Sequence, residues 1–144
     1  MTAIFKTGND RTGERVDQIK ILYADETEKD RIKADNMMRE LDVDCTCVSG
    51  PSEAIKEVMK AGGDYDCVIL DIHMGGMGGI EAGRLIRHKY RNLPIVMITE
   101  GACLETELAA RTLGGCCHLM TKPLDSAQLE SVLDTVVPGT KLEF

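Results

Sequence analysis

Three acidic residues follow two apolar segments that we expect to be buried strands. Asp71 comes directly after the apolar run at residues 67–70, and Asp25 and Glu26 follow the run at residues 19–24. In an open parallel sheet, the carboxyl ends of the strands meet at one edge, where ligand sites form. Carboxylates gathered there repel one another, so they need a cation or a raised pKa. Oxygen ligands in a solvent-accessible site suit Mg²⁺, which keeps several waters and favours phosphate as a further ligand.

Two more residues bring a hydroxyl and an ammonium group to the same edge. Thr99 ends the apolar run at residues 94–98. Lys122 follows another apolar run and precedes Pro123, which favours an extended backbone at the lysine. A carboxylate nucleophile beside a divalent cation, a hydroxyl and an ammonium suits the formation of an aspartyl phosphate, because the cations share the charge of the transferred group. These residue types therefore predict phosphoryl chemistry at Asp71.

The elements that must position these residues alternate along the chain. Apolar runs predict strands at residues 19–24, 44–48, 67–71, 94–99 and 116–120. Helical spacing predicts helices that begin near Thr27, Pro51, Gly78, Leu104 and Ser126. Five β-α units predict an α/β fold of the flavodoxin-like (βα)5 type, a doubly wound parallel sheet with strand order 2-1-3-4-5. This order places strands one and three side by side, which brings Asp25, Glu26 and Asp71 together.

The composition limits the classes of function. The 144 residues suffice for one domain with its own core. Residues 1–18 are polar and predict a flexible N-terminal lead, residues 19–137 form the expected domain, and residues 138–144 form a C-terminal tail after Pro138. A formal net charge of −7 argues against binding to nucleic acid. Neither a membrane-spanning stretch nor a signal peptide is recognisable, so we expect a cytoplasmic protein away from membranes.

The six cysteines indicate neither a metal framework nor a disulfide framework. The sequence contains no C-x-x-C pair. Five of the cysteines fall within strand-like runs: Cys45, Cys47, Cys67, Cys116 and Cys117. We expect these thiols to be buried and to pack as small hydrophobic groups.

Four motifs together resemble the receiver domain of two-component response regulators, over residues 19–137. They are ILYADE at 21–26, VILDIHMGGMGG at 68–79, PIVMIT at 94–99 and LMTKP at 119–123. The resemblance implies that Asp71 accepts a phosphoryl group from a histidine kinase or a histidine phosphotransfer protein of a phosphorelay. Such a domain switches protein–protein interactions and is not an enzyme, apart from slow hydrolysis of its own phosphate.

The resemblance also implies roles for the remaining site residues. Glu26 and Asp71 would bind Mg²⁺ together with the backbone carbonyl of His73, and Asp25 would act through a metal-bound water. The ammonium of Lys122 would pair with the acceptor carboxylate or the phosphoryl oxygens. The Thr99 hydroxyl would bind the phosphoryl group, and the Lys122–Pro123 peptide bond would be cis.

The chain departs from the usual pattern of this family at several positions. Glu26 stands where a second aspartate is usual, and it reaches one methylene further. Gly75 and Gly78 replace a proline and an aspartate in the turn after the acceptor, which loosens that turn. Glu100 follows the switch hydroxyl where a small residue is usual, and we expect it to slow phosphorylation. Leu119 replaces the aromatic residue that reports phosphorylation, so signalling would depend on Thr99 and the segment after it.

Two other functions are compatible with parts of the pattern. The first is a receiver-like interaction module that is never phosphorylated, although the complete set of acids, hydroxyl and lysine argues against it. The second is a phosphohydrolase with an aspartyl intermediate, which requires an acid where Thr27 stands. With no DNA-binding module after residue 137, output would pass through a downstream protein or through an output domain outside this chain.

Overall fold

The computed structural model describes residues 3–5, 18–101, 103–137 and 141–143. Within them, a sheet of five parallel strands forms the centre of the molecule: β2 (Lys20–Ala24), β3 (Asp44–Val48), β4 (Cys67–Asp71), β5 (Ile95–Thr99) and β6 (His118–Thr121). The spatial order is β3-β2-β4-β5-β6. This is the order 2-1-3-4-5 in terms of the five parallel strands, so the predicted flavodoxin-like fold is confirmed.

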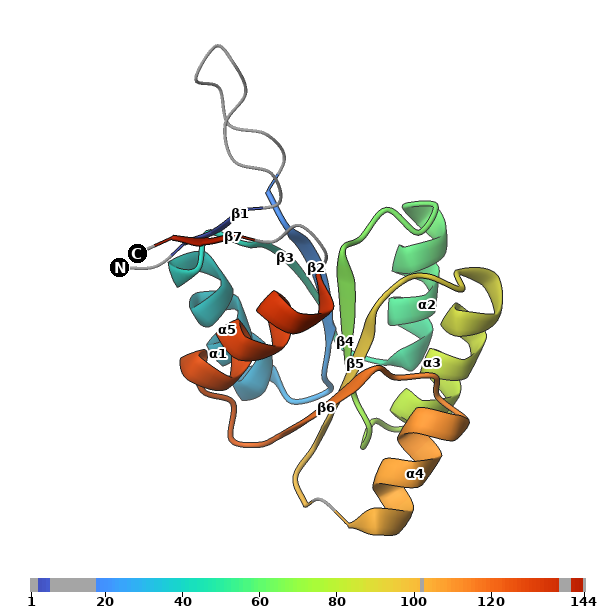
Figure 1. Cartoon of the computed structure of the whole chain (residues 1–144). Coiled ribbons are helices and arrows are strands. Elements are labelled where there is room, and N and C mark those ends of the chain that lie inside the picture. Colours follow the sequence, from blue (N-terminus) through green and yellow to red (C-terminus); the bar gives the residue numbers. More distant parts are fainter. Residues whose placement is uncertain (1–2, 6–17, 102, 138–140, 144) are drawn as a thin grey trace.

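Helices cover both faces of the sheet (Figure 1). They are α1 (Glu28–Glu40), α2 (Pro51–Lys60), α3 (Gly78–Lys89), α4 (Leu104–Thr112) and α5 (Ser126–Val136). Helices α1 and α5 pack on one face, and α2, α3 and α4 pack on the other. Among the described residues, no helix is both long enough and apolar enough to span a lipid bilayer.

The central strand β4 is buried on both faces, as its continuous apolar sequence predicts. Cys67 and Ile69 pack into the core under α1 and α5, whereas Val68 and Leu70 pack into the core on the opposite face. Each aliphatic side chain buried in this way contributes roughly 1.5–3 kcal/mol. The strand that ends in Asp71 is therefore fixed from two directions.

The start of the last parallel strand differs from the prediction. Strand β6 begins at His118 rather than at Cys116. The Cys116 N–H donates to the carbonyl of Ala110 in α4, at 3.2 Å, so this residue is tied back to the end of that helix rather than paired in the sheet. Cys116 is buried as expected, but Cys117 is exposed, and its expected burial is wrong.

The two ends of the chain contribute a second, smaller sheet. Strand β1 (Ala3–Phe5) pairs antiparallel with β7 (Lys141–Glu143), with Ala3 opposite Glu143. This pairing differs from the expectation that the two segments form a lead and a tail. The other residues of the lead, up to residue 17, and of the tail lie outside the described residues.

The close approach of α3 to β4 requires a glycine at position 79. A Cβ atom there would lie 2.1 Å from the carbonyl oxygen of Asp71 and 2.9 Å from Cα of Ile72. Both neighbours are backbone atoms, so they move only if the helix moves. Gly79 thus permits α3 to start directly beside the end of β4.

We predict that Gly79→Ala lowers the free energy of unfolding by about 1–3 kcal/mol, because the added methyl overpacks this contact. Chemical denaturation of both proteins measures the loss. The matched control is Gly101→Ala, since a Cβ at Gly101 meets no atom within 4 Å. Equal stabilities of the two variants would contradict the prediction.

Candidate functional site

The register of the sheet brings the predicted site residues to one edge. Asp71 is the last residue of β4 and lies opposite Ile98, and Thr99 at the end of β5 lies opposite Thr121. The N–H of Lys122 donates to the carbonyl of Thr99, at 2.9 Å, which extends the ladder by one residue. Acceptor, hydroxyl and lysine are therefore placed by hydrogen bonds between adjacent strands.

The ammonium of Lys122 is the centre of an ion cluster. Its Nζ lies 2.9 Å from Asp25 Oδ2, 2.9 Å from Asp30 Oδ2 and 3.0 Å from Asp71 Oδ2. Only 10% of the lysine side chain is exposed. Burial alone would lower the pKa of Lys122, but the three carboxylates outweigh burial and raise that pKa. The lysine therefore stays charged, and its bond to Pro123 is cis, as expected.

Asp25 is held firmly in its ionised form. Burial would raise the pKa of Asp25, but hydrogen bonds from the Thr27 N–H, the Lys122 ammonium and the Tyr23 hydroxyl lower it overall. The Thr27 N–H and the Tyr23 hydroxyl each lie 2.9 Å from a carboxylate oxygen of Asp25. Asp25 is therefore a fully buried anion whose oxygens already have several donors.

Asp71 differs from Asp25 in the sign of its pKa shift. Burial raises the pKa of Asp71, and the charge of Asp25 adds to this effect. The Lys122 ammonium and the His73 N–H, 2.9 Å from Asp71 Oδ1, only partly oppose it. Of the two buried carboxylates, Asp71 is therefore the one whose ionised form an added positive charge would stabilise more.

The Thr99 hydroxyl lies beside the acceptor strand without contacting a charge. Its Oγ1 donates to the carbonyl of Gly101 at 3.1 Å and lies 3.5 Å from Nε2 of His73. Thr99 is buried, whereas His73 is exposed, so the imidazole lies at the rim of the site as expected. A rotation about one side-chain bond would free the hydroxyl for another acceptor.

Glu26 occupies the solvent side of the site. Its side chain is exposed, and Oε2 accepts a hydrogen bond from the Gly75 N–H at 2.7 Å. Because the glycine turn follows the acceptor strand, this bond connects the two loops that flank Asp71. Asp25, Glu26 and Asp71 thus offer carboxylate oxygens at this edge, the ligand type that a hard divalent cation such as Mg²⁺ prefers.

The two residues expected to modify the site lie outside the ion cluster. Glu100 is exposed directly after Thr99, at the bend that ends β5. Leu119 is half-buried and packs against the core formed by α2, α3 and α4. Strand alternation explains why Leu119 faces that core while Met120 faces the other.

Sequence reasoning missed two partners in the cluster. Asp30 lies in the first turn of α1 and binds Lys122. Tyr23 donates its hydroxyl to Asp25 from two positions earlier in the chain. Side chains two residues apart in a strand share a face, and this rule is the signal that points to Tyr23.

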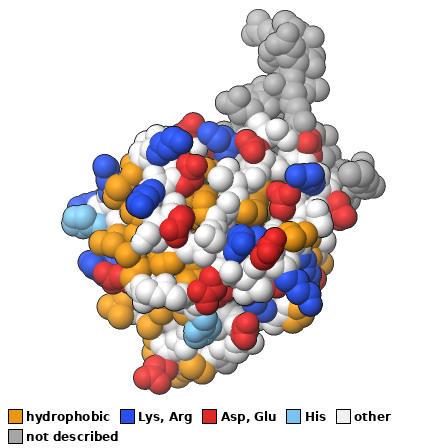
Figure 2. Space-filling view, turned by 180° about the vertical axis from the view of Figure 1, so that it is seen from behind, with side chains coloured by type: hydrophobic (Ala, Val, Ile, Leu, Met, Phe, Trp, Pro, Cys, Tyr) orange, Lys and Arg blue, Asp and Glu red, His pale blue; other side chains and the backbone are white. Residues whose placement is uncertain are grey.

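Charges of both signs are interspersed over the face shown in Figure 2. Hydrophobic side chains fill the spaces between them, and on the described part of this face Lys and Arg do not gather into a stripe. Proteins that bind a phosphate backbone concentrate basic residues on one surface.

We predict that Asp71→Asn raises the melting temperature at pH 7 in the presence of a chelator. The pKa of Asp71 is higher in the folded state than in the unfolded chain, so ionisation of this group opposes folding above that pKa. A gain of about 1 kcal/mol corresponds to roughly 4 °C in a domain of this size. The difference should shrink as the pH falls toward about 4, where the unfolded carboxyl is protonated.

The matched control is Asp134→Asn, an exposed aspartate of α5, which removes the same charge from the surface. Differential scanning calorimetry of the three proteins supplies the melting temperatures. A lower melting temperature for Asp71→Asn than for the unmodified chain would contradict the electrostatic assignment.

Curated relatives of the chain are signalling proteins. It is 29% identical over 131 residues to the sensory/regulatory protein RpfC of Xanthomonas campestris, covering 88% of this chain and 18% of RpfC. It is 31% identical over 120 residues to the chemotaxis protein CheY-3 of Vibrio cholerae, covering 82% of this chain and 91% of CheY-3. The chain thus spans less than a fifth of RpfC but nearly the whole of CheY-3.

Solved structures share the fold. The receiver domain of the sensor histidine kinase PA1611 from Pseudomonas aeruginosa, which has a magnesium ion coordinated in its active-site cleft, superimposes with a TM-score of 0.76 at 22% identity. That match covers 84% of this chain and 98% of the PA1611 domain. The family described as the response regulator receiver domain matches residues 21–134. With its strand order, its edge cluster of acids and this match, the chain belongs to the receiver domains of two-component response regulators.

Proposed function

We propose that Asp71 accepts a phosphoryl group from a phosphohistidine of a histidine kinase or a histidine phosphotransfer protein in the cytoplasm. In this reaction the N–P bond of the phosphohistidine breaks and a bond forms between phosphorus and a carboxylate oxygen of Asp71. The observation that carries the proposal is the 3.0 Å contact between Asp71 and Lys122 at the carboxyl edge of the sheet. This contact puts a fixed positive charge beside the only carboxylate that ends the central strand.

Lys122 and Thr99 take complementary parts in this proposal. The ammonium of Lys122 stabilises negative charge on the phosphoryl oxygens, because it is desolvated and fixed in position before the group arrives. The Thr99 hydroxyl leaves the carbonyl of Gly101 and donates to a phosphoryl oxygen instead. Lys122 thus stabilises the charge of the phosphoryl group, and Thr99 changes its hydrogen bond when that group is present.

Magnesium is the cofactor that this donor set favours. Asp71, Glu26 and the backbone carbonyl of His73 would hold the ion directly, and Asp25 would hold one of its waters. When bound, the ion supplies positive charge that offsets the carboxylates and the phosphoryl group. Among the described residues, the site gathers four acids, Asp25, Glu26, Asp30 and Asp71, against the Lys122 ammonium and the neighbouring Arg31 guanidinium, and this excess of negative charge supports the assignment.

Output from the domain would pass through the segment that follows Thr99. Helix α4 begins five residues later and exposes three leucines, Leu104, Leu108 and Leu113, in or directly after the helix. Leu119 provides no aromatic ring at its position in β6, so in this proposal the Thr99 hydroxyl is the group that transmits phosphorylation to α4. Exposed apolar side chains suit contact with a downstream protein or an output domain.

We predict that treatment with Mg²⁺ and a small phosphodonor adds one phosphoryl group to the chain, as read by intact mass. Asp71→Asn should remove the gain, because the amide cannot form the acyl phosphate. Asp134→Asn serves as the control and should be labelled like the unmodified protein.

Two results would contradict this proposal. Labelling that persists in Asp71→Asn would place the phosphoryl group elsewhere. No labelling of the unmodified chain, by the phosphodonor or by a phosphorylated histidine phosphotransfer protein, would favour the interaction module that is not phosphorylated.

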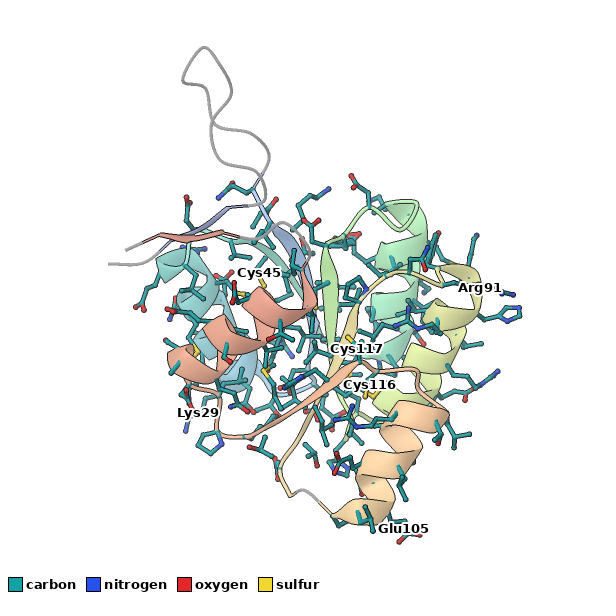
Figure 3. All side chains as sticks on the ribbon, viewed as in Figure 1. Lys29, Cys45, Arg91, Glu105, Cys116 and Cys117 are labelled. Carbon is teal, nitrogen blue, oxygen red and sulfur yellow. The ribbon has the colours of Figure 1, made fainter. Side chains whose placement is uncertain are left out.

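We predict that Glu100→Ala speeds phosphorylation of Asp71 by up to about fivefold at fixed Mg²⁺. A carboxylate near the entry path repels an anionic donor, and a unit charge at about 4 Å in water is worth about 1 kcal/mol. The control is Glu105→Ala, which removes the same charge from the first turn of α4, where Figure 3 labels Glu105. Rates measured by intact mass should rise for Glu100→Ala alone, and raised ionic strength should reduce the difference. Equal rates would show that Glu100 does not act on the entering donor.

A further inference from the structure

Two cysteines and an aspartate meet where the edge of the sheet contacts α1. Cys45 and Cys47 are separated by one residue in the edge strand β3, so their side chains share a face. Both pack against the core on the α1 and α5 side, where Figure 3 labels Cys45. Their Sγ atoms lie 3.8 Å apart. Asp35 of α1 faces them, and one donor atom from each of the three residues lies within 4.8 Å of the other two.

This spacing matches a tetrahedral metal centre. With Zn–S bonds of about 2.3 Å, two thiolates on one zinc ion lie about 3.8 Å apart. A carboxylate oxygen on the same ion lies about 3.6 Å from each sulfur. The Asp35 oxygen therefore has to move at most about 1.2 Å closer to the sulfur atoms. Because Asp35 and both cysteines are only half-buried, a small side-chain rotation supplies this movement and an ion can enter from solvent.

We propose that Asp35, Cys45 and Cys47 form a binding site for a thiophilic divalent cation of the Zn²⁺ class. Each thiol loses its proton to solvent when the metal–sulfur bond forms, and water completes the fourth position. Thiolate ligands select such ions against Mg²⁺, which prefers oxygen. The site is therefore chemically distinct from the carboxylates around Asp71.

The surroundings of the cluster are compatible with an ion. Arg39 Nε lies 3.1 Å from Asp35 Oδ2, and 76% of the arginine side chain is exposed, so it can remain as a neighbour or turn away. The Cys47 thiol donates only a long contact of 3.8 Å to the carbonyl of Arg31, which is readily given up. Two thiolates and one carboxylate carry one negative charge more than a divalent ion neutralises. The guanidinium of Arg39 can balance this remaining charge.

An ion at this position would join β3 to α1. The same helix carries Asp30, which binds Lys122, and Arg31, whose guanidinium donates to the carbonyl of Asp25 at 2.7 Å. The proposed site is thus about one helical turn from residues that hold the ion cluster. Metal binding would stiffen the connection between the edge strand and that cluster.

Cobalt(II) is a suitable probe, because thiolate ligands give it a charge-transfer band in the near ultraviolet that oxygen ligands do not give. The reduced full chain is titrated with Co²⁺ in excess Mg²⁺. We expect the band to saturate at one equivalent and to disappear on addition of Zn²⁺. Cys45→Ser/Cys47→Ser should abolish the band, and Asp35→Asn should weaken binding. The matched control is Cys103→Ser/Cys117→Ser, which removes two exposed thiols and should leave the band intact.

A second measurement uses the unmodified chain, so it does not depend on folding of the variants. Zn²⁺ should slow alkylation of Cys45 and Cys47, read by peptide mass spectrometry, without slowing that of Cys103 and Cys117. The proposal is overturned if the unmodified chain gives no band, if the band survives in Cys45→Ser/Cys47→Ser, or if Zn²⁺ leaves the alkylation of both pairs unchanged. Formation of a Cys45–Cys47 disulfide that persists in reductant would also overturn it, since the thiols would be consumed.

Discussion

The ammonium of Lys122 is the interaction on which the arrangement of this domain's functional edge depends. It binds Asp25 after β2, Asp30 of α1 and Asp71 of β4, and it reaches them from the segment after β6. Carboxylates this close repel one another strongly once they are removed from water. Removing the shared ammonium would leave the three carboxylates without their counter-charge, and such a loss in a buried ion pair typically costs about 3–5 kcal/mol. A single side chain therefore keeps four segments of the chain together at the edge that carries the chemistry.

The two buried acids at this edge differ in the direction of their pKa shifts because their surroundings differ. Asp25 is surrounded by the Thr27 N–H, the Tyr23 hydroxyl and Lys122, so its charge is already satisfied. Asp71 has fewer donors and lies beside the charge of Asp25, so its ionised form is less stabilised than that of Asp25. Each acid accepts one backbone N–H, from Thr27 or from His73, so these bonds do not distinguish them. The difference arises because Asp25 has the Tyr23 hydroxyl as a further donor, whereas burial and the charge of Asp25 raise the pKa of Asp71.

Much of the fold could be predicted from the sequence because its signals are local. The run before Asp71 is apolar on every position, and the strand at residues 44–48 has the bounds that its flanking residues suggested. Contacts that depend on the rotation of a helix were beyond sequence reasoning. The Asp30 contact to Lys122 and the approach of Asp35 to Cys45 both require knowing which face of α1 meets the sheet. The absence of a C-x-x-C motif carries no information on this cluster, because Asp35 comes from another element than the two cysteines.

The pairing of β1 with β7 brings the first and last described strands of the chain side by side, next to the N and C labels in Figure 1. The loop between α2 and β4, with Gly62 and Gly63 at positive φ, is a surface turn that enters β4 at the edge opposite Asp71. A circularly permuted chain, with a short linker joining the present ends and new ends between these glycines, would keep every contact of the acidic edge in place. The order in which the elements are synthesised is thus separable from the geometry that the chemistry needs.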